Sequence, residues 1–210
     1  GRNGALDYAF STEPGDGMCG DFIDVVAAPD GAAWCFVGDV VGHGTAAALA
    51  LAAALAVLRS ECRRSASPAQ VADHLAAELA PVLAPGQFLT LWLARVAADG
   101  RAEVVDAGHG QCWIARAAGA VDAIELRGHP PIGVVADARH GAEPLSIAPG
   151  DRCIVATDGY SESLADPAVR IACRDLLARP ASATDTLAAL RRLARRNDDD
   201  ASLLVLERRA

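Results

Sequence analysis

Residues 33–58, AWCFVGDVVGHGTAAALALAAALAVL, pass from one apolar run through a glycine-rich turn into a second apolar run. The first run, residues 33–40, is rich in aromatic and β-branched side chains and predicts a strand. The second run predicts a helix over residues 45–64 that is apolar on all sides at first. Another helix is predicted for residues 67–83, which begin Ser-Pro, because Ser is a favoured N-cap and Pro is favoured in the first turn. Two helices therefore follow one another with no strand between them.

The rest of the chain alternates short apolar runs with turns of Gly, Pro and Asp. Such short connections favour antiparallel pairing, because a parallel crossover needs about a dozen residues or more. Pro-Asp-Gly at residues 29–31 is typical of a hairpin turn, since Pro fixes φ and Gly accepts a positive φ. Antiparallel strands interrupted by pairs of helices indicate an α+β layered sandwich. We expect strands at residues 5–10, 22–28, 33–40, 88–97, 102–106, 112–116, 121–126, 152–157 and 201–207, and further helices near residues 167–178 and 183–196.

Length and composition favour a single domain over residues 1–210, and the 52% of hydrophobic residues can build a sizeable core. The formal charge is −8 and no basic stripe is present in the sequence, which argues against nucleic-acid binding. The longest apolar run, residues 45–58, is too short to span a membrane. The chain begins without Met and has no visible signal peptide, so we expect a domain excised from a longer regulatory protein.

The six cysteines, at positions 19, 35, 62, 112, 153 and 173, form no C-x-x-C pair. Most of them lie in apolar or periodic stretches. We interpret them as small buried thiols in a reducing compartment, which agrees with a cytoplasmic location. Metal thiolates and disulfides are the alternative.

Acidic residues cluster where apolar strands meet glycine. A carboxylate at the tip of a buried strand is held rigidly at the edge of the core, and a neighbouring Gly lets backbone or ligand come close. The acids in such positions are Asp21, Asp24, Asp39, Asp158 and the run Asp198-Asp199-Asp200. Tips from such distant segments could converge only if cations neutralised their repulsion. Oxygen ligands alone select Mg²⁺, Mn²⁺ or Ca²⁺ over Zn²⁺, which favours His and Cys.

Each acidic tip also has an ordinary structural explanation. Asp158 precedes Gly159, and Asp before Gly is typical of a turn. The run of acids at residues 198–200 could be a solvated cap between a helix and a strand. Asp39 is harder to explain in this way, because a strand end that leads into a helix has little need of an acid.

Five motifs follow one another along the chain: CGDFID at 19–24, GDVVGHG at 38–44, AGHG at 107–110, TDGYSES at 157–163 and DDDASLLV at 198–205. In this order they resemble the SpoIIE-type branch of the PPM superfamily, the bacterial relatives of protein phosphatase 2C. The resemblance covers residues 5–208, nearly the whole chain. It implies an αββα sandwich, in which two central antiparallel sheets are each covered by a pair of helices.

The resemblance also implies a site for two divalent cations, Mn²⁺ or Mg²⁺, at one edge of the sheets. Asp39 would bridge the two ions, and the backbone carbonyl of Val40 would bind one of them. Asp158 and Asp199 would complete the ligation of one ion. Asp21 would contact the site directly or through water.

Catalysis in such a site depends on the ions, so Asp39 and Asp158 are also the expected catalytic residues. The ions would generate hydroxide from a shared water, and this hydroxide would attack phosphoserine or phosphothreonine in line without a covalent phosphoenzyme. His43 is a candidate proton donor to the leaving alkoxide, and a hydrogen bond at the helix entry is its alternative role. The second-choice site residues are Asp24, Gly159 and Asp200.

The chain departs from the family pattern at two positions. Cys19 stands where the family usually has a second Gly, and Gly110 stands where it usually has Pro. No Arg matches the one that grips phosphate in the eukaryotic relatives, so the substrate phosphate would be held mainly by metal. We expect His109 to brace its turn and His129 to lie in a loop.

The resemblance implies that the substrate is a phosphorylated protein and suggests an anti-sigma-factor antagonist. It also implies an upstream sensor or regulatory domain. A catalytically weak module of the same fold that binds phosphoproteins is an alternative, although the intact acids argue against it. A nucleotide cyclase is another, because Gly20-Asp21-Phe22 superficially resembles a cyclase signature, but it leaves the acids at residues 158 and 198–200 unexplained.

Overall fold

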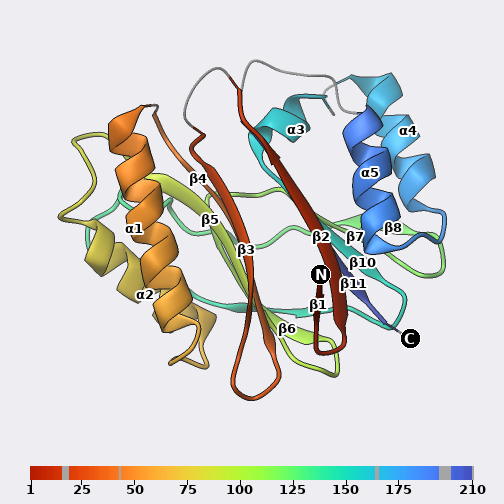
Figure 1. Ribbon diagram of the computed structural model, residues 1–210, viewed down its shortest axis with the longest axis horizontal. Coiled ribbons are helices and arrows are strands. Elements are labelled where there is room, and N and C mark those ends of the chain that lie inside the picture. The colour runs from red at the N-terminus through yellow and green to blue at the C-terminus, as the bar shows by residue number, and fades with distance from the viewer. Residues whose placement is uncertain (16–18, 43, 164–165, 194–199, 210) are drawn as a thin grey trace.

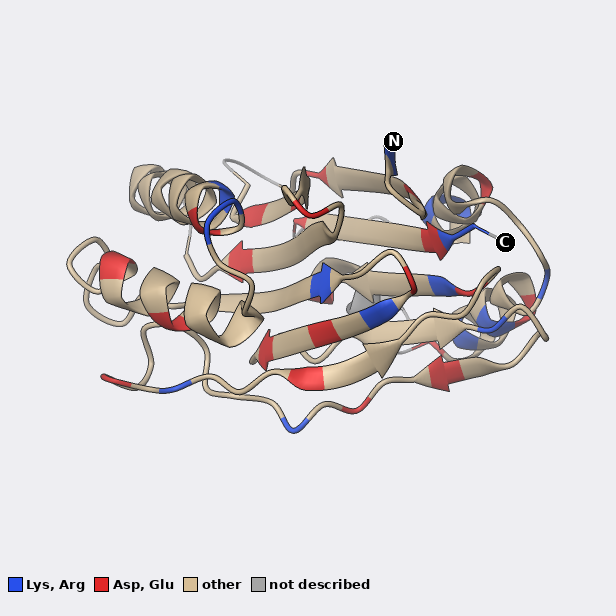
Figure 2. Cartoon of the chain, turned by 90° about the horizontal axis from the view of Figure 1, so that it is seen from below, with Lys and Arg blue, Asp and Glu red and all other residues tan. Residues whose placement is uncertain are grey.

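The computed structural model describes residues 1–15, 19–42, 44–163, 166–193 and 200–209, with only the backbone of residues 161–163. Two antiparallel sheets face each other, and helices cover the outer face of each sheet (Figure 1). Acidic residues lie on sheets and helices alike, with basic residues among them (Figure 2). The predicted α+β architecture, an αββα sandwich, is confirmed.

The first sheet has five strands in the order β3-β4-β5-β6-β9, and each neighbouring pair is antiparallel. Its strands are β3 (Asp21–Ala27), β4 (Ala33–Val40), β5 (Leu89–Val96), β6 (Arg101–Ala107) and β9 (Glu143–Ser146). The helices α1 (Thr45–Glu61) and α2 (Pro68–Leu79) cover its outer face (Figure 1). All of β4 except Asp39 is buried, because helices cover one face of this strand and the second sheet covers the other.

The second sheet has six strands in the order β1-β2-β11-β10-β7-β8. Its strands are β1 (Arg2–Asn3), β2 (Leu6–Glu13), β11 (Ala201–Arg208), β10 (Arg152–Ala156), β7 (Cys112–Ala115) and β8 (Val121–Ala123). The helices α4 (Pro167–Leu177) and α5 (Ala183–Leu193) pack on its outer face, and the short helix α3 (Asp158–Ser163) follows β10 directly (Figure 1).

The hydrophobic core has three layers, one under each helix pair and one between the sheets. On α1 the buried residues recur every three or four positions: Ala47, Ala50, Ala54 and Leu58. These mostly small side chains let α1 lie against β4, whose Trp34 and Phe36 are fully buried in the same layer. Each large apolar side chain buried in this way stabilises the fold by roughly 1.5–3 kcal/mol.

The start of α2 and the turn of the β3–β4 hairpin, both as predicted, have local causes. The Ser67 hydroxyl accepts a hydrogen bond from the backbone N–H of Gln70 at 3.5 Å, and Pro68 is the first helical residue. In the hairpin, Gly31 has a φ of 84° and its N–H donates to the Ala28 carbonyl at 3.0 Å. The predicted helix start and the predicted hairpin turn are therefore confirmed.

Three elements were not predicted: β1, β9 and α3. The strand β9 is short, partly exposed and contains Pro144, so it lacks the apolar alternation that marks a strand. The helix α3 begins at Asp158, where Asp before Gly is more typical of a turn, and Gly159 lowers its helix propensity. The helix α2 ends at Leu79 and β8 at Ala123, both earlier than predicted. The predicted end of α5 at residue 196 lies outside the described residues.

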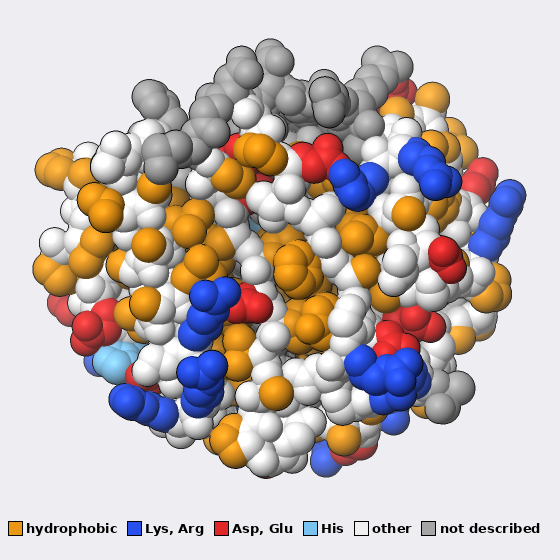
Figure 3. All heavy atoms as spheres, viewed as in Figure 1, with side chains coloured by type: hydrophobic (Ala, Val, Ile, Leu, Met, Phe, Trp, Pro, Cys, Tyr) orange, Lys and Arg blue, Asp and Glu red, His pale blue; other side chains and the backbone are white. Residues whose placement is uncertain are grey.

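All six cysteines are free, and five of them are buried. Burial raises the pKa of Cys62 to about 12, so this thiol stays protonated and unreactive. Among the described residues, no helix combines the length and the apolar character needed to cross a membrane. On the face shown in Figure 3, the described basic side chains lie in separate groups among acidic and apolar ones and form no continuous stripe.

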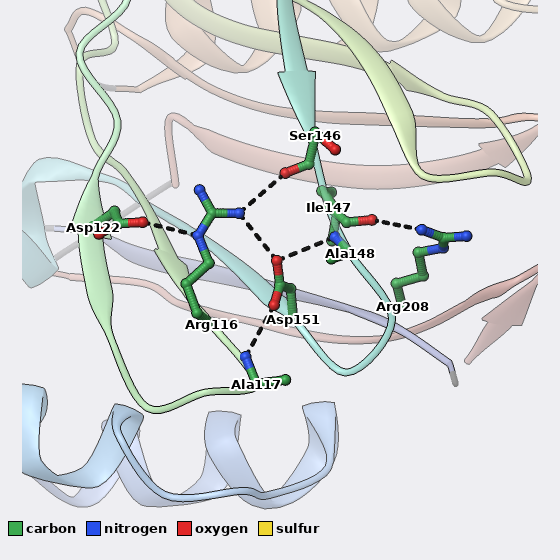
Figure 4. A network of polar contacts seen from close by, with 8 residues as sticks. All are labelled: Arg116, Ala117, Asp122, Ser146, Ile147, Ala148, Asp151 and Arg208. Carbon is green, nitrogen blue, oxygen red and sulfur yellow. Dashed lines mark hydrogen bonds and ion pairs between the residues drawn. The ribbon is translucent and has the colours of Figure 1, made fainter.

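A polar network ties the β7–β8 hairpin to the turn before β10 (Figure 4). Arg116 donates to Asp122 at 2.8 Å and to the buried Asp151 at 3.0 Å. Asp151 also accepts from the backbone N–H groups of Ala117 and Ala148 at 2.9 and 3.1 Å. Burial raises the pKa of Asp151, but these hydrogen bonds and Arg116 outweigh it, so the pKa is lowered. The network lies at the opposite end of β10 from Asp158.

Candidate active site

Two of the predicted site residues, Asp21 and Asp39, lie directly opposite each other. Asp21 opens β3, Asp39 is the penultimate residue of β4, and the antiparallel register pairs them. Directly opposed side chains in such a ladder have Cβ atoms about 4.5–5.5 Å apart and point to the same face. Two like charges in this position destabilise the fold unless a proton or a cation lies between them.

Asp21 is the more buried of the two, with 5% of its surface exposed. Its Oδ2 atom accepts a hydrogen bond from the Thr157 hydroxyl at 2.7 Å, whereas its buried Oδ1 atom has no hydrogen-bond partner among the described residues. Burial raises its pKa to about 7; the Thr157 hydrogen bond opposes this shift, and the charge of Asp39 adds to it. A buried carboxylate oxygen without a partner beside a second carboxylate is a place where a cation fits.

The ends of β10 and β11 bring further acids to this edge. The Thr157 N–H donates to the Ser202 carbonyl at 3.0 Å, and the Ser202 N–H donates to the Thr157 hydroxyl at 2.8 Å. This pairing places Asp158, which is exposed, and Asp200, which is half-buried, on neighbouring chain ends. Gly159 packs so closely against the carbonyl of Asp200 that a Cβ atom would collide with it.

Asp200, a second-choice site residue, binds backbone. Its Oδ1 accepts from the Gly15 N–H at 2.8 Å and its Oδ2 accepts from the Gly20 N–H at 2.6 Å. Both carboxylate oxygens therefore hold the chain just before Asp21. This arrangement lets Asp200 position the start of β3 next to the acids.

Gly20 provides the space next to Asp39 and Val40. A Cβ atom on Gly20 would lie 2.8 Å from the Val40 carbonyl oxygen and 2.9 Å from Asp39 Oδ1. Any side chain there would push into the gap beside these two oxygens. We predict that the Val40 carbonyl and the Asp39 carboxylate bind one ion together. Both lie beside a space that stays open only because residue 20 is Gly.

The structure does not bring Asp24 to this group. Asp24 lies three residues after Asp21 on β3, and residues an odd number apart point to opposite faces of a strand. Its carboxylate forms an ion pair with Arg59 of α1 at 2.6 Å. Asp199 and His43 lie outside the described residues, so their predicted roles stay predictions. Within the part of the chain that the structure describes, no three His, Cys, Asp or Glu residues form a ready-made metal site.

The glycine-rich turn at residues 107–110 is braced by a residue that the sequence analysis missed. Asp106 accepts hydrogen bonds from the backbone N–H groups of His109 and Gly110 at 2.8 and 2.9 Å. These hydrogen bonds to Asp106 brace the turn, and the His109 ring, which we expected to do so, takes no part in them. The ring is buried, and burial lowers its pKa to about 4, so it is neutral at pH 7. His129 lies in a loop, as predicted, where its Nε2 atom accepts from the Gly141 N–H at 2.9 Å.

Thr157 and Ser202 were also missed as site residues, although both occur in the quoted motifs. Their hydroxyl and amide groups connect the acidic tips to one another. The signal in the sequence is the hydroxyl residue directly before Asp158 and two residues after Asp200. A small polar side chain at the tip of an apolar strand has little other reason to be there.

The family model of Stage II sporulation protein E (SpoIIE) matches residues 29–209. The chain belongs to the SpoIIE family. A search of curated proteins finds no match. The geometry described above therefore belongs to a SpoIIE domain whose motifs keep the family's order.

Solved structures share the fold at low sequence identity. The RsbU and RsbW domains of a Mycobacterium tuberculosis protein superpose with a TM-score of 0.83 and 24% identity, over 99% of this chain and 61% of that one. A Streptococcus agalactiae serine/threonine phosphatase gives a TM-score of 0.75 and 16% identity over 96% of this chain and 99% of that one. RsbX, solved in complex with magnesium, gives 0.78 and 15% over 98% and 96%. These likenesses show that the chain shares the fold of PP2C-like bacterial phosphatases.

Proposed function

We propose that this SpoIIE domain is a metal-dependent phosphatase that hydrolyses phosphoserine or phosphothreonine on a partner protein. The observation that carries the proposal is the pairing of Asp21 with Asp39, with one buried oxygen of Asp21 left without a partner among the described residues. Two carboxylates at such close range call for positive charge between them. The neighbouring chain ends contribute Asp158 and, by its motif, Asp199.

The residues present fit two Mn²⁺ or Mg²⁺ ions. All the proposed donors are oxygens: the carboxylates of Asp21, Asp39, Asp158 and Asp199 and the carbonyl of Val40. Such a set favours hard cations over zinc. When bound, the ions would activate water as the nucleophile and offset charge on the phosphoryl oxygens. The magnesium complex of RsbX supports this choice of cation.

In this mechanism the residues of the chain would hold the ions and orient the groups around them. Asp39 would help to hold the ions, and Gly20 keeps the space beside Asp39 and Val40 free of side chains. Asp200 fixes the backbone before Asp21 through Gly15 and Gly20. His43 precedes α1 in the sequence and is the proposed proton donor to the leaving serine or threonine oxygen.

We further propose that the substrate is a phosphorylated anti-sigma-factor antagonist and that an upstream regulatory domain controls the reaction. The support is the SpoIIE family match and the fold shared with a structure that contains RsbU and RsbW domains. This chain spans 61% of the length of that structure, which contains two kinds of domain. The proposed regulatory domain would likewise lie outside the phosphatase domain. We assign residues 1–210 to one phosphatase domain that acts in the cytoplasm.

The proposal is tested by phosphate release. The purified chain is incubated with MnCl₂ or MgCl₂ and either p-nitrophenyl phosphate or a phosphoserine peptide, and EDTA is added to a parallel sample. We expect cation-dependent release that EDTA abolishes, and a loss of at least about 10³-fold in kcat for Asp39→Asn with an unchanged far-UV spectrum. Tight binding of the phosphopeptide without any release would instead identify a binding module.

A further inference from the structure

The contact between Thr157 and Asp21 joins the two sheets at the candidate active site. Thr157 follows β10 in the six-stranded sheet, and Asp21 opens β3 in the five-stranded sheet. The two residues are 1% and 5% exposed, and 2.7 Å separates the Thr157 Oγ1 and Asp21 Oδ2 atoms. A hydrogen bond from a hydroxyl to a buried carboxylate is strong, because the charge shortens it and no water competes for it.

The direction of this hydrogen bond is set by Ser202. A hydroxyl offers one proton and accepts through its lone pairs. The backbone N–H of Ser202 can only donate, and it donates to Thr157 Oγ1 at 2.8 Å. The hydroxyl proton of Thr157 is therefore directed to Asp21. The Thr157 N–H donates in turn to the Ser202 carbonyl at 3.0 Å, so the position of the hydroxyl is tied to β11 as well.

The acids on both sheets lie next to this contact in the chain. Asp158 directly follows Thr157, and Asp200 lies two residues before Ser202. Asp21 lies opposite Asp39 on the other sheet. A single hydroxyl thus connects the two groups of acids that must meet across the gap between the sheets.

We propose that Thr157 is a positioning residue for metal binding. Its hydroxyl fixes Asp21 Oδ2, which leaves Oδ1, the oxygen without a hydrogen-bond partner among the described residues, available to a cation. It also sets the position of Asp158 relative to Asp21 and Asp39. This inference rests on the proposed function, because it assigns Thr157 to the same metal site.

The alternative is that Thr157 only holds the sheets together. Both roles predict a lower unfolding temperature when the hydroxyl is removed, since the Ser202 N–H and Asp21 Oδ2 lose their partner. Only the positioning role predicts weaker metal binding by the protein that remains folded. The two are therefore separated by cation affinity, measured at a temperature where every variant is folded.

The experiment is isothermal titration of MnCl₂ into the full 210-residue chain, together with thermal unfolding in EDTA. Thr157→Val replaces the hydroxyl by a methyl group of similar size, and we expect it to weaken Mn²⁺ binding about 10–100-fold. Thr157→Ser keeps the hydroxyl and should restore the affinity. In the Asp21→Asn background, Thr157→Val should cause a smaller loss of Mn²⁺ affinity than in the wild type, because much of its effect acts through Asp21.

The matched control is Thr186→Val, which makes the same replacement at another buried hydroxyl. Thr186 accepts a hydrogen bond from Arg152 Nη1 at 2.6 Å, at the opposite end of β10 from Asp158. We expect a lower unfolding temperature with unchanged Mn²⁺ affinity. If Thr157→Val does not fold by circular dichroism, Thr157→Ala is used in its place.

Three outcomes decide the inference. Weaker Mn²⁺ binding by Thr157→Val with rescue by Ser supports it. Wild-type affinity in Thr157→Val, with Asp21→Asn defective, overturns the inference and leaves the proposed function standing. A wild-type chain that binds no Mn²⁺ and releases no phosphate overturns both.

Discussion

Asp21 and Asp39 are cross-strand partners in the β3–β4 ladder, and Asp21 is the buried member of the pair. Burial, together with the charge of Asp39, raises the pKa of Asp21 from its ordinary 3.8 to about 7, although Thr157 donates to it. The folded chain therefore holds this proton more tightly than the unfolded chain does. In the absence of cations, the fold therefore becomes less stable as Asp21 loses its proton and becomes charged beside Asp39.

The first prediction concerns this proton. Between about pH 4 and pH 7 the folded state binds more protons at Asp21, so its contribution to the free energy of unfolding falls as pH rises, by up to roughly 4 kcal/mol. Urea unfolding in EDTA at pH 5 and pH 8 should show that Asp21→Asn loses this part of the pH dependence. Asp24→Asn is the control, because Asp24 is paired with Arg59. Equal pH dependence in wild type and Asp21→Asn would contradict the prediction.

The second prediction concerns the space at Gly20. In Gly20→Ala the new Cβ atom would lie 2.8 Å from the Val40 carbonyl oxygen and 2.9 Å from Asp39 Oδ1. One of these oxygens must move, so Mn²⁺ affinity and turnover should fall by about tenfold or more, while overpacking costs about 1–3 kcal/mol of stability. Titration calorimetry and kcat measurements check this. Gly141→Ala is the control, because the nearest atom there, His129 Nε2, lies 3.4 Å away; equal effects of the two substitutions would argue against a special role for Gly20.

The fold could be predicted where apolar pattern and turn chemistry agree. The strand β4 has the predicted bounds, and α1 starts at Thr45 as expected, because the change from a strand pattern to an Ala-rich run is abrupt. The helix α3 was missed because Asp-Gly is a turn signal and six residues are too few to show a helical period. Its Tyr160 is buried in the core under α4 and α5, and this tertiary packing overrides the local propensity.

Only the acidic residues of the candidate site could be predicted from the sequence, and their arrangement could not. The motifs drew attention to Asp21, Asp39 and Asp158, and the structure places the first two side by side. Register and side-chain direction are not visible in the composition of a motif, so Asp24 was considered although its side chain points toward α1. Asp200 holds the backbone of Gly15 and Gly20, contacts that depend on how two distant segments meet.

The third prediction concerns His109, whose buried ring has a pKa lowered to about 4. In the unfolded chain the His109 ring takes up a proton near pH 6.5, whereas in the folded chain it does so only near pH 4. The free energy of unfolding therefore falls by up to roughly 3 kcal/mol as the pH falls from about 6.5 to 4. His109→Gln should remove this loss in urea unfolding curves. His74→Gln should act in the opposite direction, because Glu61 raises the pKa of the exposed His74. A His109→Gln variant that loses stability on acidification as wild type does would rule out this account.

The fourth prediction separates stability from activity. Asp151→Ala leaves the N–H groups of Ala117 and Ala148 without their acceptor and removes a partner of Arg116, so it should destabilise the fold by about 2–4 kcal/mol. The network lies at the far end of β10 from Asp158, so kcat per folded molecule should not change. Asp122→Ala removes only the more exposed partner of Arg116 and should cost less than about 1 kcal/mol. Urea unfolding checks the stability, and phosphate release is measured at a temperature where both variants are folded. If kcat fell together with stability, strain in this network would reach the acids at the other end of β10.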